Sequence, residues 1–116
     1  MVTAIPMEPE RAARLIEKWI NFYGMENPKA WPPEDYAYVK RASESMRLAI
    51  DILKGHTENK TAKEIAKAVN VIQEWPRMHS MNNPNMWEAE DFPFVRNALD
   101  ALMFAVSFLK EHQASQ

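Results

Sequence analysis

The strongest constraint on the fold of this chain is an internal repeat. Residues 11–54 align without a gap with residues 67–110, at a constant offset of 56 positions. Fourteen of the 44 aligned pairs are identical, whereas about three identities are expected by chance at ordinary amino-acid frequencies. Other pairs keep the size class of the side chain, such as Tyr38 with Phe94. We therefore interpret the chain as a tandem duplication, with residues 11–54 as the first half and residues 67–110 as the second half.

The length of the repeat bears on the architecture. Tetratricopeptide units recur about every 34 residues and HEAT or armadillo units about every 40–47, and stacked repeats usually need three or more copies. Two copies at an offset of 56 fit neither class. The whole chain has 116 residues, which is an ordinary size for one domain. We therefore predict a single domain over residues 1–116, with the two halves related by a pseudo-twofold axis.

Apolar side chains recur at helical spacing in both parts of each half. In the second part of the first half they occur at Val39, Ala42, Met46, Ala49, Ile50 and Leu53. The chain has only two glycines and no alternating run of β-branched residues, so nothing in it favours a strand. We predict an all-α fold made of two tandem helical hairpins, residues 8–54 and 62–111. The four expected helices cover about 8–24, 35–54, 62–79 and 91–111.

The same periodicity selects the side chains that should form the core. They are Leu15, Trp19, Val39, Met46, Ile50, Val71, Trp75, Val95, Leu102, Val106 and Leu109. One residue interrupts the pattern, because Pro76 stands where the first half has Ile20. Proline lacks the N–H group that a helix interior needs, so we expect the third helix to bend or end near Trp75.

A shared motif joins the two helices of each half. It begins Met-x-Asn-Pro-x-x-Trp-x-x-Glu-Asp and covers Met25–Lys40 and Met81–Arg96. A residue before proline avoids the helical conformation, so Asn-Pro should end one helix, while the Glu-Asp pair should begin the next. We expect Trp31 and Trp87 to pack against their hairpins. The motif is alternatively a recognition loop, since tryptophan, methionine and asparagine offer adaptable contact area.

Any binding specificity should lie where the two copies of the loop differ, because the shared residues shape the turn. The second loop, from Arg77 to Glu88, is the richer of the two in polar and methionine side chains. We expect the divergent positions to face solvent there. The residues that we expect to contact a protein partner are Arg77, His79, Met81, Asn82, Asn85 and Met86.

The second helix of each half carries a second apolar face. On a helical wheel its side chains lie about 160–200° from the centre of the core face. They are Leu48, Ile52, Phe104 and Phe108. Two explanations remain open: these helices contact neighbours on both sides within the monomer, or the second face is a homodimer interface.

Composition excludes several classes of function. Fourteen Lys and Arg against sixteen Asp and Glu give a net charge of −2, which argues against a nucleic-acid partner. The absence of cysteine excludes disulfides, thiolate metal sites and cysteine nucleophiles. The N-terminal residues lack the pattern of a signal peptide, and the longest nearly uncharged run, residues 101–109, is shorter than a membrane span, so we expect a cytoplasmic protein with no membrane partner.

The remaining hypotheses for function belong to two classes. We favour a noncatalytic helical module that binds a protein partner, including a second copy of itself, and that needs no cofactor. The alternative is an enzyme that acts on a small molecule or uses a divalent metal. Its carboxylates would come from the expected helix starts, at Glu34, Asp35, Glu90 and Asp91.

Overall fold

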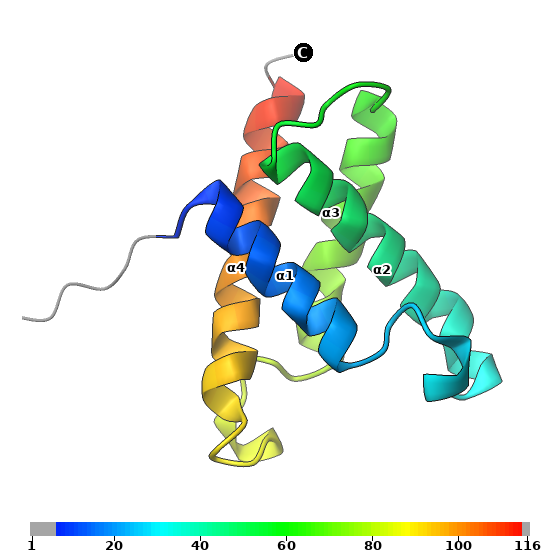
Figure 1. The fold of residues 1–116 in the computed structure, drawn as a ribbon, viewed down its shortest axis with the longest axis vertical. Helices are drawn as coiled ribbons and strands as arrows, with labels where there is room; N and C mark the ends of the chain where they lie inside the picture. Colours follow the sequence, from blue (N-terminus) through cyan, green and yellow to red (C-terminus); the bar gives the residue numbers. More distant parts are fainter. Residues whose placement is uncertain (1–6, 115–116) are drawn as a thin grey trace, which may run out of the picture.

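A computed structural model describes residues 7–114 of the chain, and it is helical (Figure 1). The elements are α1 (Pro9–Phe22), a 3₁₀ turn η1 (Pro28–Ala30), α2 (Pro33–Leu53), α3 (Ala62–Met78), a 3₁₀ turn η2 (Pro84–Met86) and α4 (Phe92–Ala114). No strand occurs within this range, so the predicted all-α class is confirmed. The observed helices begin and end within three residues of the expected positions.

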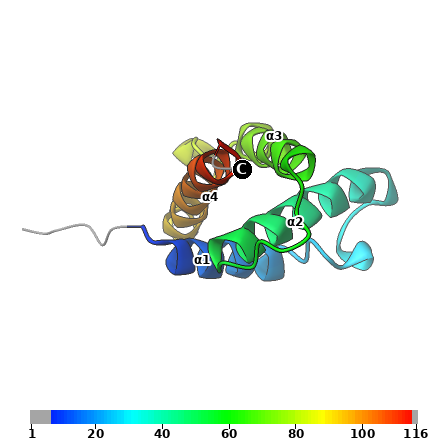
Figure 2. The same ribbon diagram turned by 90° about the horizontal axis from the view of Figure 1, so that it is seen from above.

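The four α-helices surround a shared interior. Helix α1 packs against α2 and α4, α3 packs against the same two helices, and α2 also touches α4. Figure 2 shows this arrangement from above. The loops that contain η1 and η2 lie at one end of the molecule, and the linker between α2 and α3 lies at the other (Figure 1). We call the first of these the loop end.

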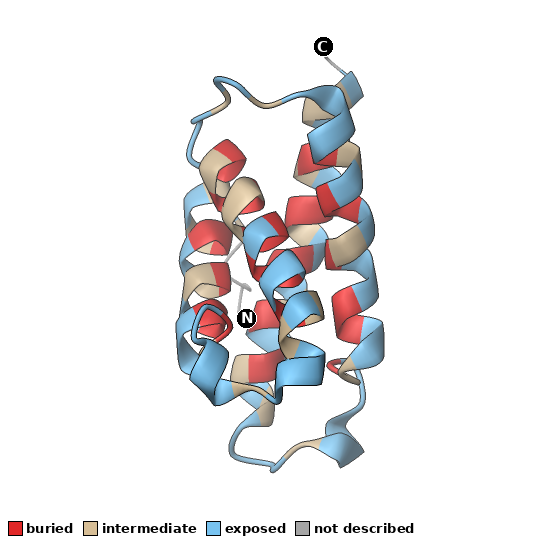
Figure 3. Ribbon diagram, turned by 90° about the vertical axis from the view of Figure 1, so that its right-hand side faces the viewer, coloured by how far each residue is buried: buried red, intermediate tan, exposed pale blue. Residues whose placement is uncertain are grey.

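Buried apolar side chains from all four helices form one core, and they lie on the facing sides of the helices in Figure 3. Nine of the eleven predicted core residues are buried. The other two, Leu15 and Val71, are half-buried and pack against the core. These two positions are 56 residues apart, so the pattern misjudged both copies of one position in the same direction.

Helix starts follow local chemistry. Helix α2 begins at Pro33, two residues earlier than expected, because proline is preorganised for the first helical position, where its missing N–H needs no partner. Asp35 therefore lies inside the first turn. Helix α3 begins after Thr61, whose hydroxyl accepts a hydrogen bond from the backbone N–H of Glu64 at 3.1 Å.

Pro76 neither ends α3 at Trp75 nor shortens it by a turn. The helix continues to Met78 with Pro76 inside its last turn. Near a helix terminus the missing N–H removes a single hydrogen bond, and the proline ring is buried in the core, as Ile20 is in the first half. The sequence predicted a bend or an end near Trp75, and α3 ends three residues later, at Met78.

Helix α4 is long and apolar enough to cross a membrane by length and composition, with a mean hydropathy of 1.4 over its most apolar window. Its apolar side chains also have a structural explanation. The helix contacts α1, α2 and α3, and it contributes seven buried residues to the core. A core helix that faces three neighbours needs apolar residues around much of its circumference.

Contacts within the monomer account for much of the second apolar face of α2 and α4. Ile52 is only 1% exposed, so its assignment to a homodimer interface was wrong. Leu48, Phe104 and Phe108 are half-buried and pack against the chain's own core. The physical reason is that α2 and α4 each have a neighbouring helix on both sides.

Candidate functional site

The two loops at the loop end are held by the same kind of hydrogen bond. The indole Nε1 of Trp31 donates to the carbonyl oxygen of Gly24 at 3.1 Å. Trp87 donates in the same way to the carbonyl oxygen of Ser80 at 2.9 Å. Both indole rings pack against the core, as predicted. The tryptophan of the motif therefore ties each loop to the end of the preceding helix.

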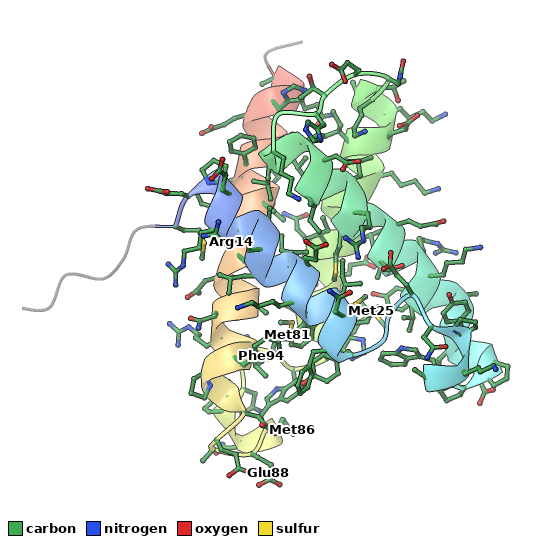
Figure 4. The ribbon with its side chains drawn as sticks, viewed as in Figure 1. Arg14, Met25, Met81, Met86, Glu88 and Phe94 are labelled. Atoms are coloured by element: carbon green, nitrogen blue, oxygen red, sulfur yellow. The ribbon has the colours of Figure 1, made fainter. Side chains whose placement is uncertain are left out.

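The conserved spacing of the motif also places a methionine under each loop. Met25 and Met81 are completely buried, and Figure 4 places Met81 inside the bundle. The expectation that Met81 contacts a partner was therefore wrong, because no surface of its side chain is available. Its apolar side chain instead fills the core beneath the turn.

Aromatic rings connect the two halves. The ring of Trp19 stacks on that of Phe94 with 5.9 Å between centroids, and Trp75 stacks on Tyr38 at 5.8 Å. Each pair joins a residue of one half to a residue of the other. Trp19 and Trp75 are buried, so these stacks position the start of α4 against the end of α1, and the start of α2 against the end of α3.

A groove lies between α3 and α4 beside the second loop, and we call it the second groove. Its volume is 410 Å³. The lining residues are Gln73, Pro76, Arg77, Ser80, Asn82, Asn83, Leu99 and Met103. Apolar atoms dominate the surface, with neutral polar groups and one positive charge. Met103 is 40% exposed, so the apolar part of the groove is accessible.

The corresponding place between α1 and α2 is bridged by an arginine. The guanidinium of Arg47 donates two hydrogen bonds to Glu26, at 3.0 and 2.9 Å, and one to Glu17 at 3.1 Å. These bonds raise the pKa of Arg47 and lower the pKa of Glu26. Arg47 corresponds to Met103 of the second groove, and its two partners correspond to Gln73 and Asn82.

A second concave site lies where the loop that contains η1, which we call the first loop, meets the end of α3. We call this site the Trp31 pocket. Its volume is 260 Å³. The lining residues are Trp31, Glu34, Asp35, Tyr38, Val39, Met78 and His79. The ring of His79 lies 3.9 Å from that of Trp75, and burial lowers the pKa of His79. His79 is therefore neutral at pH 7.

The corresponding place in the other half is occupied by larger aromatic rings. Phe22 and Tyr23 stand where Met78 and His79 line the Trp31 pocket. The ring of Phe22 lies 5.1 Å from Phe94, and that of Tyr23 lies 6.3 Å from Trp87. Trp87 also contacts Trp19 at 6.2 Å. These rings form what we call the Trp87 cluster.

The structure separates the residues that were expected to bind one partner. Arg77 and Asn82 line the second groove, whereas His79 lines the Trp31 pocket. Asn85 and Met86 are exposed and lie in η2, and Figure 4 shows Met86 at the outer part of the loop. Three further groove residues, Gln73, Leu99 and Met103, were not predicted from the sequence. Their signal was the replacement of a charged or polar residue at the same position of the first half, namely Glu17, Ser43 and Arg47.

The acidic residues of the enzyme hypothesis stay in two separate pairs. Glu34 and Asp35 lie on the rim of the Trp31 pocket, and Glu90 and Asp91 precede α4 in the other half. Within residues 7–114, no group of three or more His, Asp or Glu side chains lies close enough together to hold a metal ion. The four carboxylates therefore do not form one site.

Comparison with known proteins adds no family to these observations. No protein-family model matches the chain, and no curated protein or solved structure is significantly similar to it. The second groove and the Trp31 pocket are thus the features on which a functional assignment for this chain rests.

Proposed function

We propose that the chain is a tandem duplication of a helical hairpin, in which the second half has acquired a binding groove for a protein partner. Two sets of matched contacts support the duplication. Trp31 and Trp87 make the same hydrogen bond seven residues back along the chain. The stack of Trp19 on Phe94 also matches that of Trp75 on Tyr38, with all positions related by the offset of 56.

The function proposed is noncatalytic protein binding through the second groove. The observation that carries it is the contrast with the first half, where Arg47 bridges Glu17 and Glu26 across the corresponding place. The second groove lacks this bridge and has a volume of 410 Å³, within the range of about 300–1,000 Å³ that is usual for binding sites. An accessible apolar surface with a few polar groups around it is the general form of such sites.

The charges at the second groove select the chemistry of the partner. Arg77 is exposed and makes no ion pair with any residue in the range 7–114. No Asp or Glu lines the groove. We therefore propose that the occupant is a peptide segment with an Asp or Glu beside a large apolar residue. The carboxylate pairs with Arg77, and the apolar side chain lies on Leu99 and Met103.

Transfer of the first half's ion pairs into the second groove tests this function. The triple variant Gln73→Glu, Asn82→Glu, Met103→Arg places the three residues of the Arg47 bridge at the corresponding positions of the second half. Exposed ion pairs contribute only about 0–1 kcal/mol to stability, so the variant is expected to fold with little change in the free energy of unfolding. It is expected to lose binding.

The probe is a random-peptide library displayed on phage, selected against the unmodified protein. We expect enriched peptides to combine an acidic residue with a neighbouring large apolar residue and to bind the triple variant at least tenfold more weakly. Arg77→Ala is expected to weaken binding of these peptides about tenfold, equivalent to about 1.4 kcal/mol. Failure to enrich such peptides, or equal binding to the triple variant, contradicts the proposal.

A matched control opens the first half instead. The variant Glu17→Gln, Glu26→Asn, Arg47→Met removes the bridge between α1 and α2 and leaves the second groove unchanged. We expect it to bind the selected peptides with unchanged affinity. The remaining candidate occupant of the second groove is a second copy of the chain. Analytical ultracentrifugation of the unmodified protein and of the triple variant tests it by measuring their oligomeric states. A dimer that only the triple variant loses identifies a second copy of the chain as the partner and overturns the proposal of a separate acidic peptide.

A further inference from the structure

The Trp31 pocket has the size of a site for one side chain. Its volume of 260 Å³ lies below the range of about 300–1,000 Å³ that is typical of sites for drug-sized ligands. It lies between α2, the first loop and the end of α3, and it shares no lining residue with the second groove. What it binds is therefore a question separate from the function proposed above.

The rim of the pocket carries two carboxylates. Glu34 and Asp35 are exposed in the first turn of α2. Neither carboxylate forms an ion pair with a residue in the part of the chain that the structure describes. His79 is the basic side chain among the lining residues. Burial lowers its pKa, so it is uncharged at pH 7. The pocket thus has a net charge of about −2 at that pH.

Two aromatic side chains line the pocket. Trp31 and Tyr38 both line it, and the electron-rich faces of such rings attract cations. Tyr38 is held in place by its stack on Trp75. Its hydroxyl is buried and has no hydrogen-bond partner among residues 7–114. The lining therefore combines two aromatic side chains, one of them held by a stack, with two carboxylates.

The Trp87 cluster occupies the place in the other half that corresponds to the Trp31 pocket. Phe22 and Tyr23 place their rings beside Phe94 and Trp87 there. In the Trp31 pocket these two positions are occupied by Met78 and by the smaller ring of His79. Met78 and Phe22 are both exposed, at 61% and 69%. The Trp31 pocket therefore has His79 beside its two carboxylates, at the position where the other half has the larger ring of Tyr23.

We propose that the Trp31 pocket binds the guanidinium group of an arginine side chain presented by a partner. A guanidinium is planar and weakly hydrated, so it stacks on aromatic rings, and its parallel N–H groups match a carboxylate. An ammonium group is a more strongly hydrated point charge and gains less from an aromatic wall. The pocket supplies both kinds of contact, with Trp31 and Tyr38 as the rings and Glu34 and Asp35 as the carboxylates.

Nuclear magnetic resonance of the indole N–H groups provides the test. The probe is Nα-acetyl-arginine N-methylamide, added at up to tens of millimolar. We expect a saturable change in the indole signal of Trp31 and no saturable change in that of Trp87, whose N–H makes the equivalent hydrogen bond in the other half. The citrulline analogue has nearly the same shape without the charge, and we expect at least tenfold weaker binding.

Two double variants form a matched pair. Glu34→Gln with Asp35→Asn removes the carboxylates of the pocket, and Glu90→Gln with Asp91→Asn makes the same change at the corresponding positions of the other half. Both pairs are exposed. We expect the first variant to lose at least tenfold in affinity for the arginine probe and the second to bind as the unmodified protein does.

Three results would each overturn the proposal. One is the absence of a saturable change at Trp31 with the arginine probe. Another is equal binding of the citrulline analogue, which is measured on the unmodified protein and does not depend on any variant folding. The third is an equal loss in the two double variants, because a general effect of net charge acts on both halves alike. None of these results bears on peptide binding in the second groove.

Discussion

The places between α1 and α2 and between α3 and α4 differ in side chain at seven of the eight positions that line the second groove. In the first half Arg47 forms ion pairs with Glu17 and Glu26. At the corresponding positions of the second half, Met103 lines the groove together with Gln73 and Asn82. A long charged side chain with two partners is thereby replaced by one of the most adaptable apolar side chains. An ion-pair bridge thus spans the place between α1 and α2, whereas neutral side chains line the groove between α3 and α4 at the same three positions.

The energetic contribution of the ion-pair bridge is small. The side chains of Arg47 and Glu26 remain 34% and 49% exposed in their ion pair. Partly exposed pairs of this kind contribute about 0–1 kcal/mol, because water competes with the interaction and two long side chains lose conformational freedom. The second half has Met103 and Asn82 at the positions of Arg47 and Glu26. We therefore expect this difference to change the binding surface with little effect on the free energy of unfolding.

The Trp31 pocket and the Trp87 cluster are corresponding places that differ in the packing of their aromatic side chains. The cluster buries ring surface against Trp19, Phe94 and Trp87, so it contributes to stability. The pocket gives up part of that contact and leaves an open wall. The largest measurable difference between the halves should therefore be in the cost of removing the two loop tryptophans.

Truncation of the loop tryptophans tests that difference. We expect Trp87→Ala to lower the free energy of unfolding by about 3 kcal/mol, because it removes ring contacts as well as a hydrogen bond. Trp31 makes no ring contact within residues 7–114 and lines an open pocket, so Trp31→Ala should cost about half as much. Urea unfolding followed by circular dichroism measures both values. An equal decrease in the free energy of unfolding for both variants would contradict the proposal that the Trp87 cluster contributes more to stability than the Trp31 pocket.

The two left-handed turn residues should respond in opposite directions. Gly24 and Ser80 both adopt positive φ, at 58° and 52°. A Cβ at position 24 would lie 3.1 Å from the Cβ of Ala30, so Gly24→Ala is expected to cost about 1–2 kcal/mol. Ser80→Gly removes the side-chain strain and should stabilise the second loop by up to about 1 kcal/mol. Thermal unfolding of both variants checks the signs, and a neutral Gly24→Ala contradicts the turn geometry.

His79 should give the second half a small dependence of stability on pH. Burial lowers its pKa below the ordinary value of 6.5, so the unfolded chain binds the proton more tightly than the folded protein. Stability is therefore complete above about pH 6.5 and decreases as the pH falls through the lowered pKa. His79→Tyr, which introduces the residue found at position 23, should flatten that decrease between pH 7 and 5. An identical pH dependence in the unmodified protein and the variant contradicts the assignment.

Much of the fold follows from side-chain spacing. The apolar period placed the four helices within three residues, and it identified Trp19 and Trp75 as buried. The site was less accessible to such reasoning. The composition of the second loop led to Arg77 and Asn82 of the second groove, but it also suggested Met81, which is buried beneath the turn. Spacing along a loop does not say which side of the loop a side chain takes, so only the packed structure separates them.

The sequence by itself determined the helical class, the turn residues and the repeat, because these depend on local backbone preferences and on a period that can be read along the chain. The tertiary structure alone decided which faces meet. It buried Ile52 between neighbouring helices and brought His79 to Trp31 from the other half. It also placed Arg47 across from Glu17 and Glu26, 30 and 21 residues away. Contacts between residues so far apart depend on how helices pack in three dimensions, which no period along one helix specifies.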